Sequence, residues 1–342
     1  MIIICTKSFL LLPLSRQYVY CICYFRPMSI GLLLVSWFTL VELNCENLFD
    51  TQHDTLRQDT EFLPEGSHHW TRTRYWHKLN RVGQTILACG GEGEDWQLPD
   101  LVALTEVEND TVLRDLTRRS LLRQARYEYV MTDSPDERGI DVALLYSPFS
   151  FAPVTHRSIR VPLLDDMKPT RDVLYVAGRT MGGDTLHVLV VHAPSRSGGE
   201  RATRAFRMQV ARCIAQTADS IRAVAPDARI VVTGDFNAYR GEACLAFLEE
   251  RGLRDVTATA EGTHGAKGTY KYHGLWASLD HTLCSTAMEQ RVAEAFVMDA
   301  PFLLEDDEKY GGVQPRRNYL GPRYLNGFSD HLPLVVRFRF NN

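Results

Sequence analysis

The chain has 342 residues, with 38 Lys and Arg against 42 Asp and Glu, and a formal net charge of -4. This balance excludes proteins that hold nucleic acid by bulk positive charge, such as histone-like binders. A hydrophobic content of 45% and a charged content of 23% exclude intrinsic disorder, collagen-like repeats and a many-pass membrane protein. Eight cysteines without CxxC spacing argue against a disulfide scaffold and against a structural zinc site.

Residues 1–36 differ in composition from the rest of the chain. They are rich in Ile, Leu, Phe, Tyr and Cys, and Lys7, Arg16 and Arg26 are their only charges. Their apolar runs are shorter than the roughly 20 residues of a membrane-spanning helix, and no Ala-x-Ala cleavage site follows them. Three interpretations stay open: a signal or membrane-proximal leader, a mis-set start codon with Met28 as the better beginning, and an ordered extension. Localisation and membrane association stay open with them.

Residues 37–342 are expected to form one domain, because no low-complexity linker interrupts them. In chain order we predict a strand at 38–44, a helix at 72–89, a strand at 101–105, a helix at 111–124, strands at 127–131, 141–146, 173–178 and 186–192, a helix at 200–224, a strand at 229–233, a helix at 242–251, and strands at 279–284 and 334–340. This order lacks strict βα alternation. It favours an α/β fold of two packed mixed sheets flanked by helices over a doubly wound parallel sheet.

Polar residues gather where these apolar strands end or begin. The segments concerned are Asn44-Cys-Glu46, Thr105-Glu106, His192-Ala-Pro-Ser-Arg196, Gly234-Asp-Phe-Asn237 and Ser329-Asp-His331. One such segment alone is typical of a turn, a cap or an ordinary histidine. Together they supply several carboxylate and amide oxygens, two histidines and no cysteine cluster, which suits Mg²⁺ or Mn²⁺ rather than structural Zn²⁺.

These motifs resemble those of the endonuclease/exonuclease/phosphatase superfamily, also called deoxyribonuclease I-like. The resemblance covers residues 38–340 in the family's order, and Gly-Asp-Phe-Asn together with Ser-Asp-His is highly specific. Segments 44–50, 138–146 and 192–196 are similar to those of bacterial members. The resemblance implies a four-layer α/β sandwich and a metal-dependent phosphoesterase.

The resemblance also implies which residues surround the metal ion. Glu106 would be the principal ligand, with Asn44, Glu46 and Asp330 around the metal directly or through water. Many relatives carry Asp where this chain has Glu46, and the longer side chain favours contact through water. Mg²⁺ keeps several waters and takes few protein carboxylates, which agrees with such a set.

The catalytic roles follow from the same resemblance. Asp235 would orient or deprotonate the attacking water, and Asn237 would hold that water or the phosphate in line. His331 would contact the scissile phosphate and take part in proton transfer, oriented by Asp280. His192 would stabilise charge on the phosphoryl group or protonate the leaving oxygen.

Substrate contacts are expected from three basic residues. Arg138 stands where several DNA-repair relatives carry an active-site tyrosine, and either contacts phosphate or is a solvated turn residue. Arg196 and Lys271 are the other predicted substrate contacts. Segments 268–273 and 316–324 mix cations with aromatics, either as a surface for phosphate and ring stacking or as loops that pack on the rim of the sandwich.

Three functions stay open at this point. The first is a Mg²⁺- or Mn²⁺-dependent nuclease or phosphatase that hydrolyses a phosphodiester or phosphomonoester. The second is a lipid or small-molecule phosphoesterase, similar to the family's sphingomyelinases and inositol phosphatases. The third, a non-catalytic binding protein, is disfavoured because every expected polar position is filled. The expected partner is a phosphoester substrate, nucleic acid included, and the protein is expected to be a monomer.

Overall fold

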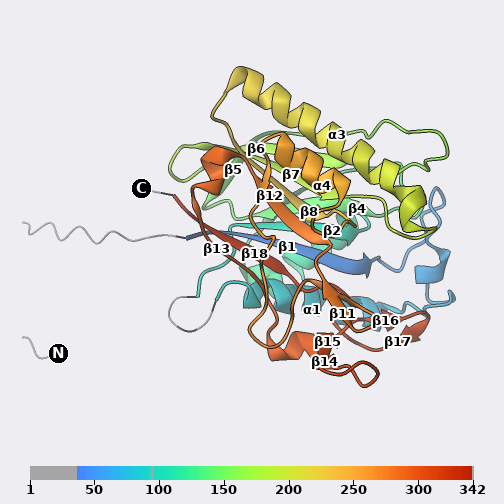
Figure 1. Cartoon of the computed structure of the whole chain (residues 1–342). Helices are drawn as coiled ribbons and strands as arrows, with labels where there is room; N and C mark the ends of the chain where they lie inside the picture. Colours follow the sequence, from blue (N-terminus) through green and yellow to red (C-terminus); the bar gives the residue numbers. More distant parts are fainter. Residues whose placement is uncertain (1–36, 92, 94–95, 341–342) are drawn as a thin grey trace, which may run out of the picture. The chain divides into compact units, whose positions relative to one another are not determined.

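Two six-stranded mixed sheets pack face to face, and helices cover their outer faces (Figure 1). The computed structural model describes residues 37–91, 93 and 96–340. The predicted N-terminal extension, residues 1–36, lies outside these described residues. The predicted fold class, an α/β sandwich of two mixed sheets flanked by helices, is confirmed. Within the described part of the chain, no helix is both long enough and apolar enough to span a bilayer.

The first sheet brings the ends of two parallel strands to one edge. Its order is β13 (Val292–Val297), β18 (Leu334–Arg339), β1 (Trp37–Leu48), β2 (Leu101–Val107), β4 (Asp141–Tyr146) and β3 (Glu128–Met131). β1 and β2 run parallel, and the other neighbours are antiparallel. Asn44 of β1 stands opposite Thr105 of β2. The polar motifs of these two strands therefore lie at the same edge.

The second sheet places three more of the predicted site residues, His192, Asp235 and Asp280, side by side on adjacent strands. Its order is β5 (Phe151–Ile159), β6 (Val173–Thr180), β7 (Thr185–His192), β8 (Arg229–Asp235), β12 (Asp280–Cys284) and β9 (Arg254–Asp255). β7 and β8 run parallel, and the other neighbours are antiparallel. The register pairs His192 with Asp235, and Asp235 with Asp280. These three residues are thus neighbours across adjacent strands.

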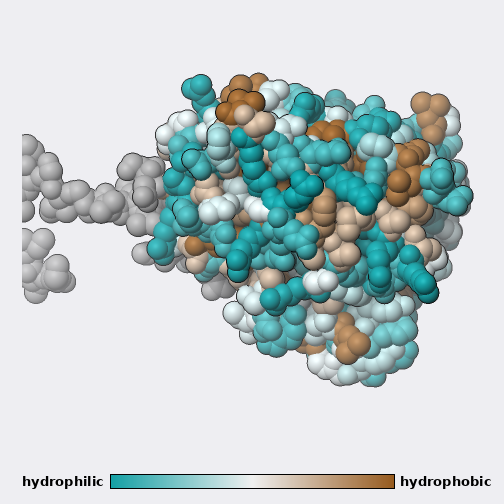
Figure 2. Space-filling view, turned by 45° about the horizontal axis from the view of Figure 1, so that its top comes forward, coloured by the Kyte–Doolittle hydropathy of each residue, from teal (hydrophilic) through white to brown (hydrophobic). Residues whose placement is uncertain are grey.

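Four longer helices complete the layers. Apolar residues of α1 (Arg72–Ala88) and α2 (Asp110–Arg118) share one buried cluster with β1 and β2. Those of α3 (Glu200–Val224) and α4 (Ala243–Glu250) share another with β7 and β8. A third cluster fills the space between the sheets. The face shown in Figure 2 is mostly hydrophilic, with hydrophobic residues in small separate patches. Burial of the apolar residues of the three clusters stabilises the fold.

Short elements occupy the connections. Three hairpins are formed by β10 (Tyr270–Tyr272) with β11 (Leu275–Ala277), β14 (Leu304–Asp306) with β15 (Val313–Pro315), and β16 (Tyr319–Leu320) with β17 (Arg323–Tyr324). Short helices are α5 (Thr286–Glu289) and the 3-10 turns η1 (Thr60–Phe62), η3 (Leu121–Gln124) and η4 (Pro301–Leu303). The first of these hairpins reaches the site described below.

The structure contains strands that the sequence prediction lacks, namely β5, β9, β13 and the three hairpins, and one predicted helix ends early. β5 and β13, which the prediction lacks, are edge strands, and most of β5 is exposed, so its sequence carries little of the apolar alternation that marks a strand. The helix predicted at 111–124 ends at Arg118. Ser120 then begins a 3-10 turn, where its Oγ accepts a hydrogen bond from the Leu122 N–H at 3.1 Å, a local bond that competes with the helix.

Candidate active site

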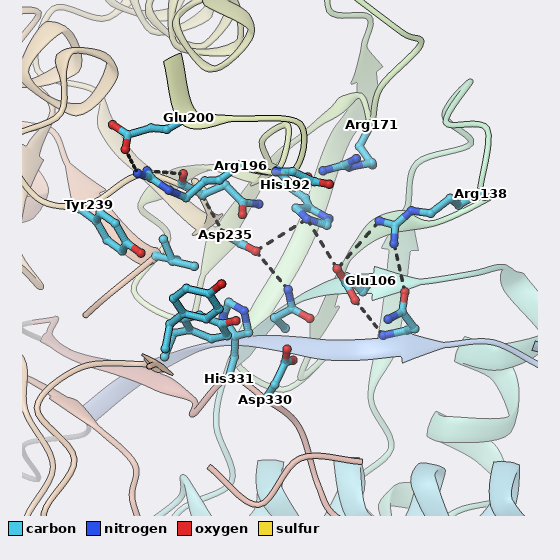
Figure 3. Close-up of a pocket in the computed structure, with 18 residues that line it drawn as sticks. Glu106, Arg138, Arg171, His192, Arg196, Glu200, Asp235, Tyr239, Asp330 and His331 are labelled. Carbon is cyan, nitrogen blue, oxygen red and sulfur yellow. Dashed lines mark hydrogen bonds and ion pairs between the residues drawn. The ribbon is translucent and has the colours of Figure 1, made fainter. Parts of the chain in front are cut away.

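A cavity of about 1010 Å³ opens where the strand ends of the two sheets meet. The predicted residues that line it are Asn44, Glu106, Arg138, His192, Arg196, Asp235, Asn237, Asp330 and His331. Figure 3 shows Glu106, His192 and Asp235 close together, with His331 and Asp330 beside them. Residues from β1, β2, β7 and β8 and from the loop before β18 are therefore brought to one place, as the motifs predict.

Each carboxylate oxygen of Asp235 accepts a hydrogen bond that fixes its position. Its Oδ2 accepts a hydrogen bond from Asn44 Nδ2 at 3.1 Å, across the two sheets. Its Oδ1 accepts from the backbone N–H of Asn237 at 2.8 Å, and Asn237 Nδ2 donates to the Ala193 carbonyl at 3.1 Å. Burial and the charge of Asp280 raise the pKa of Asp235 to about 7. A carboxyl group with that pKa exchanges protons near neutral pH.

Backbone conformation explains why Gly234 precedes this aspartate. Gly234 has a φ of 143°, and a Cβ there would lie 1.9 Å from the Val191 carbonyl oxygen. Asn237 also has a positive φ, 48°, a region where Asn is tolerated better than most residues. Gly234 therefore lets β8 lie close against β7 in the sheet, while Asp235 and Asn237 line the cavity.

Glu106 reaches the cavity through an irregularity in β2. The register of β2 against β4 shifts between Thr105 and Val107, and Glu106 itself has a φ of 59°. Such bulges redirect a side chain. Glu106 Oε2 accepts from the Asn47 N–H at 2.8 Å, while Oε1 lies 3.8 Å from His192 Nε2. One carboxylate oxygen is thus anchored and the other faces its neighbours in the cavity.

His331 and Asp280 form a buried pair. His331 Nδ1 lies 2.7 Å from Asp280 Oδ2, which leaves Nε2 for the cavity that His331 lines. Burial lowers the pKa of His331, but the charges of Asp280, Asp330 and Asp235 oppose it and raise the pKa well above its ordinary value. The imidazole is therefore positively charged. Ligand atoms of Asp235, Asp280 and His331 lie within 4.8 Å of one another.

His192 has the opposite character. Burial, followed by the charges of Arg171 and Arg138, lowers its pKa well below the ordinary value, so the imidazole is neutral. Its Nε2 lies 3.7 Å from Asp235 Oδ2. Its Nδ1 has no hydrogen-bond partner within the described residues. The site thus contains one charged and one neutral histidine, each suited to a different role.

Three arginines line the same cavity. Arg138 donates to Asn47 Oδ1 at 3.2 Å, and Arg196 is held by Glu200 at 2.6 Å and lies 4.3 Å from the Tyr239 ring centre. Arg171, which the sequence analysis does not single out, is buried and pairs with Asp136 at 3.1 Å. Arg171 stands just before β6 outside any motif, so only the three-dimensional structure places it here.

The oxygen donors fit a divalent cation. Asn44, Glu106 and Asp330 line one cavity and offer the carboxylate and amide oxygens that Mg²⁺ and Mn²⁺ prefer. Burial and nearby negative charge raise the pKa of Asp235, and a bound cation would reverse this effect. Asp330 also accepts from Arg317 Nη2 at 2.9 Å, so part of its charge is already paired.

Three predicted residues do not line this cavity. Asp280 lies behind His331, as a supporting residue would. The Glu46 carboxylate, expected around the metal, instead accepts from the backbone N–H groups of Asn318 and Tyr319 at 2.6 and 2.8 Å. Lys271, expected to contact substrate, instead pairs with Asp307 at 2.7 Å. In both cases a residue or backbone group from a distant part of the chain pairs with the charged side chain. The spacing of residues along the sequence does not reveal such partners.

Fold and site together define a phosphoester hydrolase built on an α/β sandwich. The chain belongs to the Endonuclease/Exonuclease/phosphatase family, whose sequence profile matches residues 39–339. Endonucleases, exonucleases and phosphatases all cleave phosphoesters. The family therefore gives the general chemistry, while the substrate depends on features particular to this chain.

Solved structures with this fold come from bacteria and from animals. A family protein of Bacteroides thetaiotaomicron is 16% identical, with a TM-score of 0.59 over 88% of this chain and 97% of the other. The mannosyl-6-phosphatase of the same bacterium is 16% identical, with a TM-score of 0.57 over 89% and 100%. The human Nocturnin catalytic domain is 19% identical, with a TM-score of 0.54 over 89% and 94%. No match is found among curated proteins. At these identities the likeness shows the fold alone.

Proposed function

We propose that this chain is a divalent-metal-dependent phosphoesterase of the nuclease or phosphatase type, which hydrolyses a phosphodiester or a phosphomonoester. The observation that carries the proposal is the buried group of Asp235, Asp280 and His331 beside a cavity that three arginines also line. A carboxyl group with a pKa near 7 next to a charged imidazole suits acid–base chemistry. Arginine suits phosphate, because its guanidinium is always charged and presents several donors.

Asn44, Glu106 and Asp330 would hold the metal ion, directly or through water. A bound Mg²⁺ or Mn²⁺ supplies positive charge that stabilises the phosphoryl oxygens during hydrolysis. Glu106 is the principal candidate because the bulge in β2 turns it into the cavity and the Asn47 N–H fixes one of its oxygens. Asn44 orients Asp235 at the same time, which links the metal-binding group to the group proposed to act on water.

Asp235 would orient the attacking water and accept its proton. Its two oxygens are fixed by Asn44 and Asn237, so the carboxylate keeps one orientation. Without a bound cation its pKa is about 7, so it is a stronger base than an ordinary aspartate, and a cation held nearby would lower that pKa and keep the carboxylate ionised at neutral pH. Asn237, held by the Ala193 carbonyl, would keep the water or the phosphate in line.

The two histidines would act on the phosphoryl group. His331 would donate from Nε2 to a phosphoryl oxygen, because Asp280 occupies Nδ1. The lowered pKa of His192 favours hydrogen bonding to the phosphoryl group over protonation of the leaving oxygen. Arg138, Arg171 and Arg196 would bind the remaining phosphate oxygens. A lipid or small-molecule phosphoesterase would use the same groups and differ only in the leaving group.

Hydrolysis of bis-p-nitrophenyl phosphate and p-nitrophenyl phosphate tests the proposal. We expect turnover with Mg²⁺ or Mn²⁺ that is lost in EDTA, and a decrease in kcat of about 100-fold or more in the Asp235→Asn and His331→Ala variants. The Asp219→Asn variant, in an exposed ion pair on α3, is the control and should keep full activity. Absence of metal-dependent turnover on these compounds and on a panel of DNA, sphingomyelin and inositol phosphates would contradict the proposal.

A further inference from the structure

The hairpin of β10 and β11 stands directly beside His331. Tyr270 forms an antiparallel bridge with His331 outside the main sheets, and the two ring centres are 4.9 Å apart. Tyr270 and Tyr272 both line the cavity. One wall of the proposed active site is therefore aromatic, next to the imidazole that would contact phosphate.

This hairpin is held in place by contacts away from the cavity. Its turn residues His273 and Gly274 have φ values of 49° and 82°, as a tight two-residue hairpin turn requires. A Cβ on Gly274 would lie 2.7 Å from Tyr310 Cβ, so the turn packs closely on that residue. Lys271, between the two tyrosines, pairs with Asp307 at 2.7 Å. The hairpin is thus fixed before any ligand binds.

The two tyrosine rings are nearly parallel and separated. Their planes differ by 13° and their centres are 6.5 Å apart, about twice the ~3.4 Å rise between stacked bases. Residues i and i+2 of a strand share a face, which places both rings on the same side of β10. The two nearly parallel rings therefore present aromatic surface on one side of β10, beside His331, on which a planar ring of a ligand can stack.

Tyr272 is oriented although it is poorly buried. The side chain is 57% exposed, yet its ring stacks on His273 with centres 4.1 Å apart and planes 18° apart. His273 in turn stacks on Tyr310. A half-exposed aromatic ring contributes little to the core, whereas a pre-oriented ring loses little entropy when a ligand stacks on it.

We propose that Tyr270 and Tyr272 form a stacking subsite for a planar ring carried by the phosphoester, as in a nucleotide or an aryl phosphate. The subsite rests on the proposed function, because the phosphate of the same molecule would bind at His331 and the arginines. Stacking recognises the face of a ring and every nucleobase has one. The subsite would therefore favour phosphoesters that carry an aromatic ring over sugar phosphates that lack one, and it would not discriminate between nucleobases.

Ligand binding to the full chain in EDTA tests this subsite independently of turnover. The ligands are adenosine 5′-monophosphate, ribose 5-phosphate, which lacks the ring, and phenyl phosphate. We expect adenosine 5′-monophosphate to bind about tenfold more tightly than ribose 5-phosphate. If phenyl phosphate also binds about tenfold more tightly than ribose 5-phosphate, the subsite accepts any aromatic ring. If only the nucleotide binds more tightly, the subsite recognises a nucleoside. Equal affinities of all three would overturn the subsite.

Variants assign the effect to the rings. Tyr272→Leu should reduce the preference for the nucleotide to about threefold or less, whereas Tyr272→Phe should retain it. Leu275→Ala, an exposed position on the same hairpin, is the matched control and should behave as the native chain does. A Tyr272→Leu protein that is folded and keeps the full preference would also overturn the subsite.

Turnover of the same compounds with Mg²⁺ separates the two proposals. Ring preference in binding, together with no metal-dependent turnover of these compounds or of the phosphoesters named under Proposed function, would support the subsite and contradict the proposed function. Metal-dependent turnover with equal kcat/KM for the nucleotide and ribose 5-phosphate, together with equal affinities, would support the function and overturn the subsite.

Discussion

Asp280 contacts both proposed acid–base groups without lining the cavity itself. Its carboxylate pairs with His331, and its backbone is paired with Asp235. Its negative charge raises the pKa of both residues. At the scale of single residues, one fully buried carboxylate therefore keeps the histidine charged and makes the neighbouring aspartate more basic.

The Asp280→Asn variant tests this influence through the pH dependence of kcat. The uncharged amide no longer favours the protonated forms, so the pKa values of Asp235 and His331 should both fall. Activity that requires ionised Asp235 and protonated His331 would then move to lower pH on both its acidic and its alkaline side. We expect a shift of about one pH unit, measured as complete pH–rate profiles.

A second histidine–aspartate pair provides the control. His281 Nδ1 lies 2.8 Å from Asp255 Oδ2 in the same sheet, and neither residue lines the cavity. Asp255→Asn removes a similar pair and should leave the pH profile in place. If Asp280→Asn lowers activity at every pH without moving the profile, Asp280 acts through shape alone.

At the scale of elements, the strand ends at the site adopt conformations that strands normally avoid. Glu46, Glu106 and Asn237 all have positive φ values, between 48° and 59°. Such conformations persist only where surrounding contacts enforce them, and they are common at functional sites. Gly234, near the end of β8, has a φ of 143° and no room for a Cβ, so this position is also sensitive to an added side chain.

Gly234→Ala is expected to destabilise the protein and to displace Asp235. The added Cβ would meet the Val191 carbonyl at 1.9 Å, so β7 and β8 must separate. We expect a loss of about 3 kcal/mol or more in the free energy of unfolding, measured with urea, and a large decrease in activity. Gly183→Ala is the control, because Gly183 has a φ of 81° but open space around it, and about 1 kcal/mol is expected there. Equal losses in the two variants would contradict the steric argument.

Most of the fold and of the site follow from local sequence patterns. Strands such as β4 and β7 are bounded by polar turns and carry continuous apolar residues, and so their positions are predicted within a residue or two. Gly234 and Asn237 have backbone conformations that only a few residue types tolerate. Arg171, Glu46 and Lys271 differ, because their partners are distant in sequence and no local pattern reveals which neighbour satisfies a charge.

At the scale of the whole molecule, several buried carboxyl groups make the stability depend on pH. Burial raises the pKa of Asp100 to about 6, of Glu46 and Asp235 to about 7, and of Glu108 to about 8. A carboxyl group whose pKa is raised on folding stabilises the folded state below its unfolded pKa, ~4. That contribution is lost as the pH rises through the folded value. Two histidines whose pKa values are lowered by burial, His187 and His192, act in the opposite direction, but the carboxyl groups with raised pKa values outnumber them.

The metal-free protein should therefore be less stable at pH 8.5 than at pH 5.5, and Mg²⁺ should stabilise it more at the higher pH. We expect the Tm in EDTA to fall by several degrees between these values, because the carboxyl groups with raised pKa values ionise in buried surroundings. Bound Mg²⁺ stabilises only the folded state, and its positive charge favours the ionised form of the neighbouring Asp235, so its effect should grow as Asp235 ionises.

Two variants distinguish Mg²⁺ binding in the cavity from the pH-dependent stability that buried carboxyl groups elsewhere provide. Glu106→Gln should reduce the effect of Mg²⁺ on the Tm, because it removes the principal proposed ligand. Glu108→Gln should weaken the pH dependence in EDTA but keep the full effect of Mg²⁺, because Glu108 lies outside the cavity and accepts a hydrogen bond from the Asp50 N–H at 2.6 Å. A Tm that responds to Mg²⁺ equally in both variants would mean that the ion binds elsewhere, and the proposed set of Asn44, Glu106 and Asp330 would then be wrong.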